Sequence, residues 1–270
     1  MKDIFDFKRF GNYFLYDLKN AQSRFLISLL VLGCLPVITF FFGEIFHLIG
    51  TGSWDFNYDV GFRVFTFVVA SLITILVFPV KVYGGLTDKR RGSDWVLIPA
   101  SVTEKFVSMV LIVCVVLPVC LFAILFGADA LMSLFFPHAY GAPLPNIDIL
   151  KQFSEEMSFN SYGLEVNIDP TGLLICYWFT NILAFTLGAV FFKKSKVAKT
   201  FLVAAIIGML FSSLISIFFT GNMTSLENMI ESMNAVELFK TLNVFLNVSI
   251  WLEIIVLLVC LYLRLKTIKH

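Results

Sequence analysis

The chain has 270 residues, of which 59% are apolar and 14% are charged, and its formal net charge is +1. Soluble domains average roughly 45–50% apolar and 25% charged residues, so this composition excludes both an ordinary soluble domain and a disordered chain. The small net charge excludes a nucleic-acid-binding protein that relies on overall positive charge. We therefore expect an integral membrane protein.

The first predicted element is an amphipathic helix over residues 1–24. Its apolar side chains recur at helical spacing on one face, and they are Phe7, Phe10, Gly11, Phe14, Leu18 and Ala21. The opposite face carries Lys8, Arg9, Asn12, Tyr16 and Lys19. Such a helix is expected to lie in the inner membrane interface, with its apolar face toward lipid. The alternative is that the apolar face packs on protein.

Six apolar segments follow, each close to the ~20 residues that a helix needs to cross a hydrocarbon core of about 30 Å. They are residues 25–43, 64–80, 106–126, 172–192, 201–219 and 245–263. Their length and lack of alternation favour helices over barrel strands. The predicted fold class is an all-α integral membrane protein, with residues 1–270 forming a single polytopic membrane domain.

The distribution of Lys and Arg predicts the orientation, because cytoplasmic loops carry an excess of both. With the N-terminus inside, only Arg63, Lys151 and Lys240 fall outside. The other 17 positive residues fall inside, and they are Lys2, Lys8, Arg9, Lys19, Arg24, Lys81, Lys89, Arg90, Arg91, Lys105, Lys193, Lys194, Lys196, Lys199, Arg264, Lys266 and Lys269. Both termini are therefore expected in the cytoplasm.

The outer loops differ in size. Residues 137–171 form the longest extracytoplasmic loop, and within it residues 147–157 have the spacing of a short amphipathic helix. The loop of residues 220–243 also has a helical pattern, which suits a helix at the outer membrane surface. We therefore expect short outer helices in both loops.

The inner loop of residues 81–105 has two helix-compatible pieces. Gly92 ends the first piece, and Ser93 or Asp94 is suited to cap a short second helix through Leu97, which Pro99 ends. Residues 101–104, Ser-Val-Thr-Glu, have the spacing of a capping box at the start of the third span. The loop is then either a short helix held against the inner surface, where a partner pushes on two spans, or a solvated basic loop that only sets topology.

This order of residues resembles the cytoplasmic loop of ABC-2 type transporter permeases. In that family a Gly-Thr/Ser pair precedes a short coupling helix, a Pro-x-Ser/Thr turn and a Lys before the third span, and the matching residues here are Gly92, Ser93, Pro99, Ser101 and Lys105. The stretch of residues 97–106, Leu-Ile-Pro-Ala-Ser-Val-Thr-Glu-Lys-Phe, is similar to permease-like proteins of Bacteroides-type bacteria. The chain differs in having Lys-Arg-Arg at 89–91, where many members carry a Glu shortly before the glycine.

The resemblance implies the membrane-spanning subunit of an ABC exporter in the bacterial cytoplasmic membrane. Its partners would be a cytoplasmic ATP-binding subunit, a second permease copy in a homodimer or heterodimer, and membrane lipids, with no nucleic acid. The substrate class would be lipid-linked, peptide or drug-like molecules moved outward. The surface implied to couple to the ATPase consists of Arg91, Gly92, Ser93, Asp94, Trp95, Leu97, Pro99, Ser101 and Lys105.

The sequence contains no Gly-x-x-x-x-Gly-Lys-Ser/Thr phosphate-binding loop, so ATP and Mg²⁺ are expected in the partner subunit. His47, His138 and His270 have no paired ligand spacing. No nucleophile and base can be assembled from the loops. We therefore expect no catalytic residue, metal site or cofactor in this chain, and do not expect an enzyme.

Glu253 is the only charged residue within the six predicted spans. A charge near the middle of a membrane helix costs about 2.5–3.5 kcal/mol on insertion scales, so its side chain is expected to face the bundle. Asn247 on the same helix and Asn181 on the fourth span are candidate polar neighbours. The group is either part of a translocation path or a polar clamp between helices.

Two other classes of function remain open. The chain could be a non-transporting membrane scaffold or assembly protein whose basic loop binds a different partner. It could also be an ion-coupled carrier that uses Glu253. The single intramembrane charge argues against a carrier, because coupled carriers generally need more polar groups.

Overall fold

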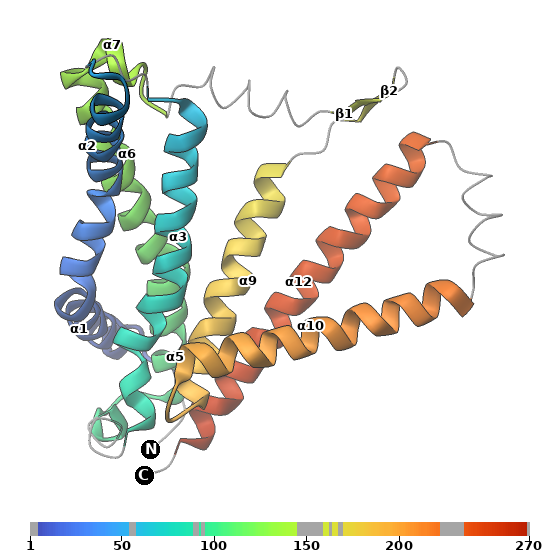
Figure 1. Cartoon of the computed structure of the whole chain (residues 1–270). Coiled ribbons are helices and arrows are strands. Elements are labelled where there is room, and N and C mark those ends of the chain that lie inside the picture. Colours follow the sequence, from blue (N-terminus) through green and yellow to red (C-terminus); the bar gives the residue numbers. More distant parts are fainter. Residues whose placement is uncertain are drawn as a thin grey trace. The chain divides into compact units, whose positions relative to one another are not determined.

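The computed structural model describes residues 5–53, 58–88, 92, 95–144, 159–161, 164–166, 170–221 and 235–268. Contacts within the chain divide it into two compact units (Figure 1). Unit 1 is Met1–Gln152 with Lys269–His270, and unit 2 is Phe153–Ile268. Both units are predominantly helical where they are described.

Unit 1 consists of helices packed side by side. Its elements are α1 (Phe7–Gly33), α2 (Leu35–Thr51), α3 (Val60–Val82), the 3₁₀ helix η1 (Gly84–Thr87), α5 (Val102–Leu111), the π-helix η2 (Ile112–Val116), α6 (Leu117–Phe135) and α7 (Pro137–Tyr140). α2 packs against α3 and α6, and α1 packs against α3, α5 and α6 (Figure 1). The inner loop therefore begins and ends on helices that α1 contacts.

The N-terminal helix and the first span are joined differently from the prediction. α1 runs without a break from Phe7 to Gly33, so the helix continues across the expected boundary between residues 24 and 25. The chain changes helix at Cys34 instead, and α2 starts with Pro36 in its first turn. Proline has no N–H to donate to the preceding turn, which accounts for the break at this point.

The face of α1 that packs on protein lies beside the predicted apolar face. Tyr13, Asp17, Ala21 and Phe25 are buried and recur every four residues along the helix. Of the predicted apolar residues only Ala21 belongs to this row, and Phe7 is 83% exposed. Packing on protein therefore holds for one side of α1, and much of the predicted apolar face stays uncovered.

The third predicted span lies in a helix that extends past both of its expected ends. The capping box predicted at residues 101–104 is confirmed, since Ser101 Oγ accepts the N–H of Glu104 and Glu104 accepts the N–H of Ser101. From there α5, η2 and α6 run on to Phe135, nine residues beyond the expected end at residue 126. Asp129, which follows the expected end of the span, is therefore inside a helix.

Unit 2 contains the remaining predicted spans. Its elements are the antiparallel strands β1 (Phe159–Ser161) and β2 (Leu164–Val166), followed by α9 (Pro170–Phe191), α10 (Lys196–Gly221) and α12 (Ala235–Thr267). α9 packs against α10 and α12. α12 begins ten residues before the predicted sixth span, within the loop expected to be helical. The hairpin was not anticipated, and residues 147–157 and 222–234 lie outside the described residues.

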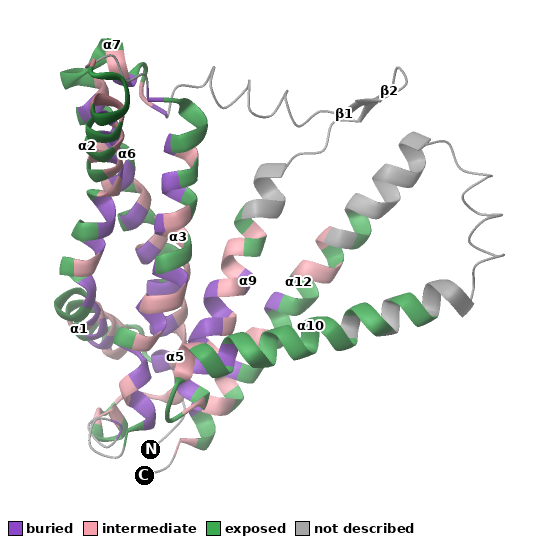
Figure 2. Ribbon diagram, viewed as in Figure 1, coloured by how far each residue is buried: buried purple, intermediate pink, exposed green. Residues whose placement is uncertain are grey.

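Four helical stretches in the described residues are long and apolar enough to cross a membrane, and they are Phe7–Thr51, Val60–Val82, Val102–Phe135 and Asn247–Thr267. α9 has a shorter apolar stretch, Ile175–Phe191. Large apolar side chains are exposed along these helices and along α10, which is mostly green in Figure 2. Such a surface fits a multi-pass helical membrane protein, because lipid rather than water covers it.

Candidate functional site

The inner loop places its predicted coupling residues in different environments. Gly92 is buried in a helical turn and its N–H donates to Asp88 O at 2.8 Å. A second helical turn covers Trp95–Leu97 and ends before the exposed Pro99, as the sequence predicted. Arg91, Ser93 and Asp94 lie outside the described residues.

Trp95 is turned toward the protein rather than away from it. Its indole Nε1 donates to Tyr13 Oη on α1 at 3.2 Å. Lys105 Nζ donates to the Trp95 carbonyl at 2.7 Å and lies 4.4 Å from the centre of the indole ring. Leu97, two residues further on, is 79% exposed. Of Trp95 and Leu97, which are both predicted for the coupling surface, Leu97 is therefore the residue available to a partner.

The Glu104 carboxylate joins the start of α5 to the start of α1. It accepts hydrogen bonds from Arg9 Nε at 2.8 Å and from Arg9 Nη2 at 2.6 Å. It also accepts the backbone N–H groups of Asp6 at 3.0 Å and Ser101 at 2.9 Å. The side chain has no exposed surface. A buried charge is tolerated under these conditions, with an opposite charge and several hydrogen bonds around it.

Asp17 is the second point at which α1 is attached to the loop. Its buried Oδ2 accepts from Ser108 Oγ on α5 at 2.8 Å and from Tyr83 Oη at 3.3 Å. Burial and the Asp17 carboxylate raise the pKa of the Tyr83 phenol, so this group stays protonated and donates. About two turns further along α1, Arg24 Nη1 donates to Val82 O at 3.0 Å. α1 thus holds both ends of the inner loop, at the end of α3 and at the start of α5.

A groove runs along α1 beside these attachments. Its larger part has a volume of about 410 Å³ and is lined by Asp6, Lys8, Arg9, Asn12, Tyr13 and Tyr16 of α1 and its N-cap, and by Ile98, Pro99 and Ala100 of the loop. A smaller hollow of about 100 Å³ shares Tyr13, Tyr16 and Ile98 with it and extends toward Tyr83. The groove is therefore formed by α1 on one side and by the loop on the other.

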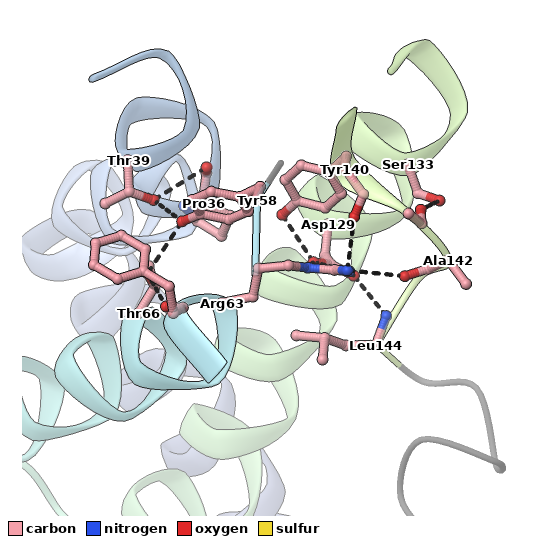
Figure 3. Close-up of polar contacts among 12 residues, drawn as sticks. Pro36, Thr39, Tyr58, Arg63, Thr66, Asp129, Ser133, Tyr140, Ala142 and Leu144 are labelled. Atoms are coloured by element: carbon pink, nitrogen blue, oxygen red, sulfur yellow. Dashed lines mark hydrogen bonds and ion pairs between the residues drawn. The ribbon is translucent and has the colours of Figure 1, made fainter. Parts of the chain in front are cut away.

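A second polar cluster lies in unit 1 near the end of α6, where the sequence analysis predicted no site (Figure 3). Arg63 of α3 and Asp129 of α6 are both buried and form an ion pair. Arg63 Nε and Nη2 donate to Asp129 Oδ1 at 3.1 and 2.8 Å, and Nη2 donates to Oδ2 at 2.8 Å. The two-pronged geometry is that of strong arginine–carboxylate pairs.

The chain that follows α6 folds back onto this pair. Tyr140 Oη donates to Asp129 Oδ1 at 2.9 Å, and the Leu144 N–H donates to Oδ2 at 2.8 Å. Arg63 Nη1 donates to the carbonyls of Tyr140 at 3.0 Å and Ala142 at 2.9 Å (Figure 3). Burial, and then the Asp129 carboxylate, raise the pKa of the Tyr140 phenol, which keeps it a donor.

Aromatic packing closes the Arg63–Asp129 cluster against α2. The Tyr58 and Tyr140 rings are stacked with their centres 5.3 Å apart, and Phe40 of α2 contacts both edge-on. Tyr58 Oη and Thr39 Oγ1 are hydrogen-bonded at 2.6 Å (Figure 3). All charged groups in the cluster have partners and are buried, so its geometry is that of a structural clamp rather than an open reactive site.

The residues proposed for a translocation path lie on two helices of unit 2, α9 and α12. Glu253 on α12 is exposed within unit 2, and its expected place facing the bundle stays a prediction. Asn181 Nδ2 donates to Tyr177 O on its own helix at 2.8 Å. Asn247 is half-buried on α12. The exposure of Glu253 arises because α12 contacts α9 through another side of the helix, where Ile254, Leu261 and Leu265 are buried.

Within the residues that the structure describes, no three or more His, Cys, Asp or Glu side chains gather where they could hold a metal ion. No protein-family model, curated protein or solved structure matches this chain. The arguments for function therefore rest on the geometry of the inner loop with its groove and of the Arg63–Asp129 cluster.

Proposed function

We propose that this protein is the membrane-spanning permease subunit of an ABC-2 type exporter. In this proposal the six apolar helices cross the bacterial cytoplasmic membrane with both termini inside. A separate subunit hydrolyses ATP, and a second permease copy completes the path of a lipid-linked, peptide or drug-like substrate. The chain itself then holds no cofactor and catalyses no reaction.

The observation that carries the proposal is the attachment of the inner loop to two membrane helices and to α1. The helical turn Trp95–Leu97 is fixed by Trp95 and Lys105, while Leu97 remains exposed. A force on Leu97 would reach α5 through Lys105, and α1 through Tyr13. Coupling of ATP hydrolysis to helix movement needs such a contact, because a flexible loop would absorb the displacement instead of transmitting it.

The carrier alternative depends on Glu253. A coupling carboxylate in a carrier is expected to face the bundle interior or a water-filled cavity. Glu253 is exposed within unit 2, so its part in a carrier stays a prediction. The scaffold alternative predicts the same membrane fold with a partner that lacks a nucleotide site, so the partner distinguishes the two.

The direct test is purification of the tagged protein from its native membrane in a mild detergent, followed by identification of bound proteins. We expect a Walker-A ATPase whose activity depends on this chain. Leu97→Asp should abolish binding of the ATPase or its stimulation, because it places a charge on the exposed contact. Leu97→Met is the matched control and should keep both, since it preserves an apolar side chain of similar volume.

Two results would contradict the proposal. One is a stable partner with no nucleotide-binding site, which would favour the scaffold. The other is ATPase binding that is the same for Leu97→Asp and Leu97→Met, which would place the coupling contact elsewhere.

A further inference from the structure

The groove along α1 lies next to the part of the helix that is suited to contact lipid. Phe7 is 83% exposed and Leu15 is 64% exposed, and the exposed Lys8 and Lys19 border this apolar surface along one edge. Apolar side chains bordered by lysines are typical of a helix in the plane of the membrane interface. The groove lies beside this surface, on the side of α1 that carries Asn12 and Tyr16. In a helix that lies in the interface, the groove would therefore open at the depth of the lipid headgroups.

The wall that α1 contributes to the groove carries hydrogen-bond donors in one row. Lys8, Asn12 and Tyr16 are spaced four residues apart, so they lie one above the other on the helix, and all three are exposed. Within the described residues the Lys8 ammonium group has no ion pair. Its charge is therefore available to a ligand.

The other charges around the groove are largely satisfied by protein. The Arg9 guanidinium is paired with Glu104. Asp6 Oδ1 accepts the backbone N–H groups of Lys8 and Arg9 at 2.9 and 3.5 Å, so this carboxylate caps α1. Ile98 and Pro99 give the opposite wall an apolar character. The groups left to bind a ligand in the groove are the Lys8 ammonium group, the neutral side chains of Asn12 and Tyr16, and the apolar wall of Ile98 and Pro99.

We propose that this groove binds the headgroup of an anionic phospholipid. The phosphate lies against Lys8, Asn12 and Tyr16, and the acyl chains lie over the exposed Phe7 and Leu15 side of α1. A volume of about 410 Å³ falls within the range of small-ligand sites. An occupied groove would bridge α1 and the loop at Ile98–Ala100, so the bound lipid would strengthen the attachment of the loop. The proposal does not depend on a partner ATPase.

The experiment titrates the purified protein in a neutral detergent and counts bound molecules by native mass spectrometry. The three probes are phosphatidylglycerol, phosphatidylcholine with the same acyl chains, and inorganic phosphate. We expect phosphatidylglycerol to bind at a concentration at which the other two do not. Phosphatidylcholine that binds equally well overturns recognition of charge, and phosphate that binds as tightly as the lipid overturns the lipid as the source.

Matched variants locate the site. Lys8→Gln should weaken phosphatidylglycerol binding about fivefold, the effect of one lysine near an anionic lipid surface. Lys19→Gln removes the same charge from the same helix outside the groove and should have little effect. Equal losses in both variants would mean diffuse attraction to the helix and would overturn the site.

A filled groove tests the shape of the site without a change in charge. Ala100→Phe should abolish phosphatidylglycerol binding, because the new ring occupies the loop side of the groove. Asn12→Trp fills it from α1 and replaces Ala100→Phe if that variant does not fold. Wild-type affinity in a folded, groove-filled variant would overturn the proposal.

Discussion

Arg63 and Asp129 show how a charge that looks ordinary in the sequence becomes a buried structural group. The sequence predicts Arg63 as one of three outside cations, and Asp129 follows the predicted third span. The side chains lie 66 positions apart and meet because α3 and α6 both extend past the apolar stretches predicted for them. Nothing local in either segment indicates the pairing.

Removal of one member of this pair should destabilise unit 1 strongly. Asp129→Ala leaves a buried guanidinium without its counter-charge, which costs about 3–5 kcal/mol in comparable buried pairs. The measurement is denaturant unfolding of the purified protein in detergent. Asp88→Ala removes an exposed carboxylate and serves as the control.

A double variant separates the buried charge from the loss of packing. Arg63→Met with Asp129→Leu removes both charges and keeps apolar volume, so it should be more stable than Asp129→Ala alone. A single variant that unfolds like the wild type would contradict the structural role of the clamp.

Helix α1 and the start of α5 illustrate what can and cannot be predicted for single elements. The helical period, the amphipathic pattern and the capping box at Ser101–Glu104 are local, because each depends on residues within two turns of one another. The pairing of Glu104 with Arg9 joins positions 95 apart and cannot be read from either segment. The inward orientation of Trp95 also depends on Tyr13, which is 82 positions away. Short-range patterns therefore predicted the elements, and long-range contacts decided which residues are available.

The crossing of α1 and α6 depends on Gly33. A Cβ atom there would lie 2.0 Å from Ile124 Cγ2, a branched side chain that has few alternative rotamers in a helix. Gly33→Ala should therefore destabilise the protein by about 1–3 kcal/mol, measured by denaturant unfolding. Ile124→Ala in the same chain should restore part of the loss.

The control for this crossing is Gly127→Ala on α6. No atom lies within 4 Å of the Cβ that it would add, so the substitution should be neutral or slightly stabilising. If Gly33→Ala and Gly127→Ala behave alike, the close approach of the two helices at Gly33 is wrong.

At the scale of the whole molecule, the distribution of positive residues predicts that the inner loop and α7 lie on opposite sides of the membrane. Leu97→Cys and His138→Cys test this, because both positions are exposed. The five native cysteines, all free, are first replaced by alanine. A membrane-impermeant thiol reagent added to intact cells should label His138→Cys at once and Leu97→Cys only after permeabilisation. Labelling of both before permeabilisation would refute the proposed topology.

The π-helix η2 interrupts the long helix formed by α5, η2 and α6. It changes the angle around the helix axis between residues before it and residues after it. From Met109 to Asp129 a buried side chain recurs every four residues, through Val113, Leu117, Leu121 and Leu125. In a regular α helix such a row turns by about 40° at each step, or about 200° over five steps, because each turn takes 3.6 residues. The wider turn of η2 takes up extra residues and returns part of that rotation.

Ser108 contacts Asp17, and Asp129 contacts Arg63. The five residues of η2 lie between Ser108 and Asp129 and therefore set the angle between these two side chains around the helix axis. Conversion of η2 to ordinary α helix with one residue fewer would rotate one attachment against the other by about 100°. A variant with that deletion should therefore keep only one of the two contacts, Ser108 with Asp17 or Asp129 with Arg63.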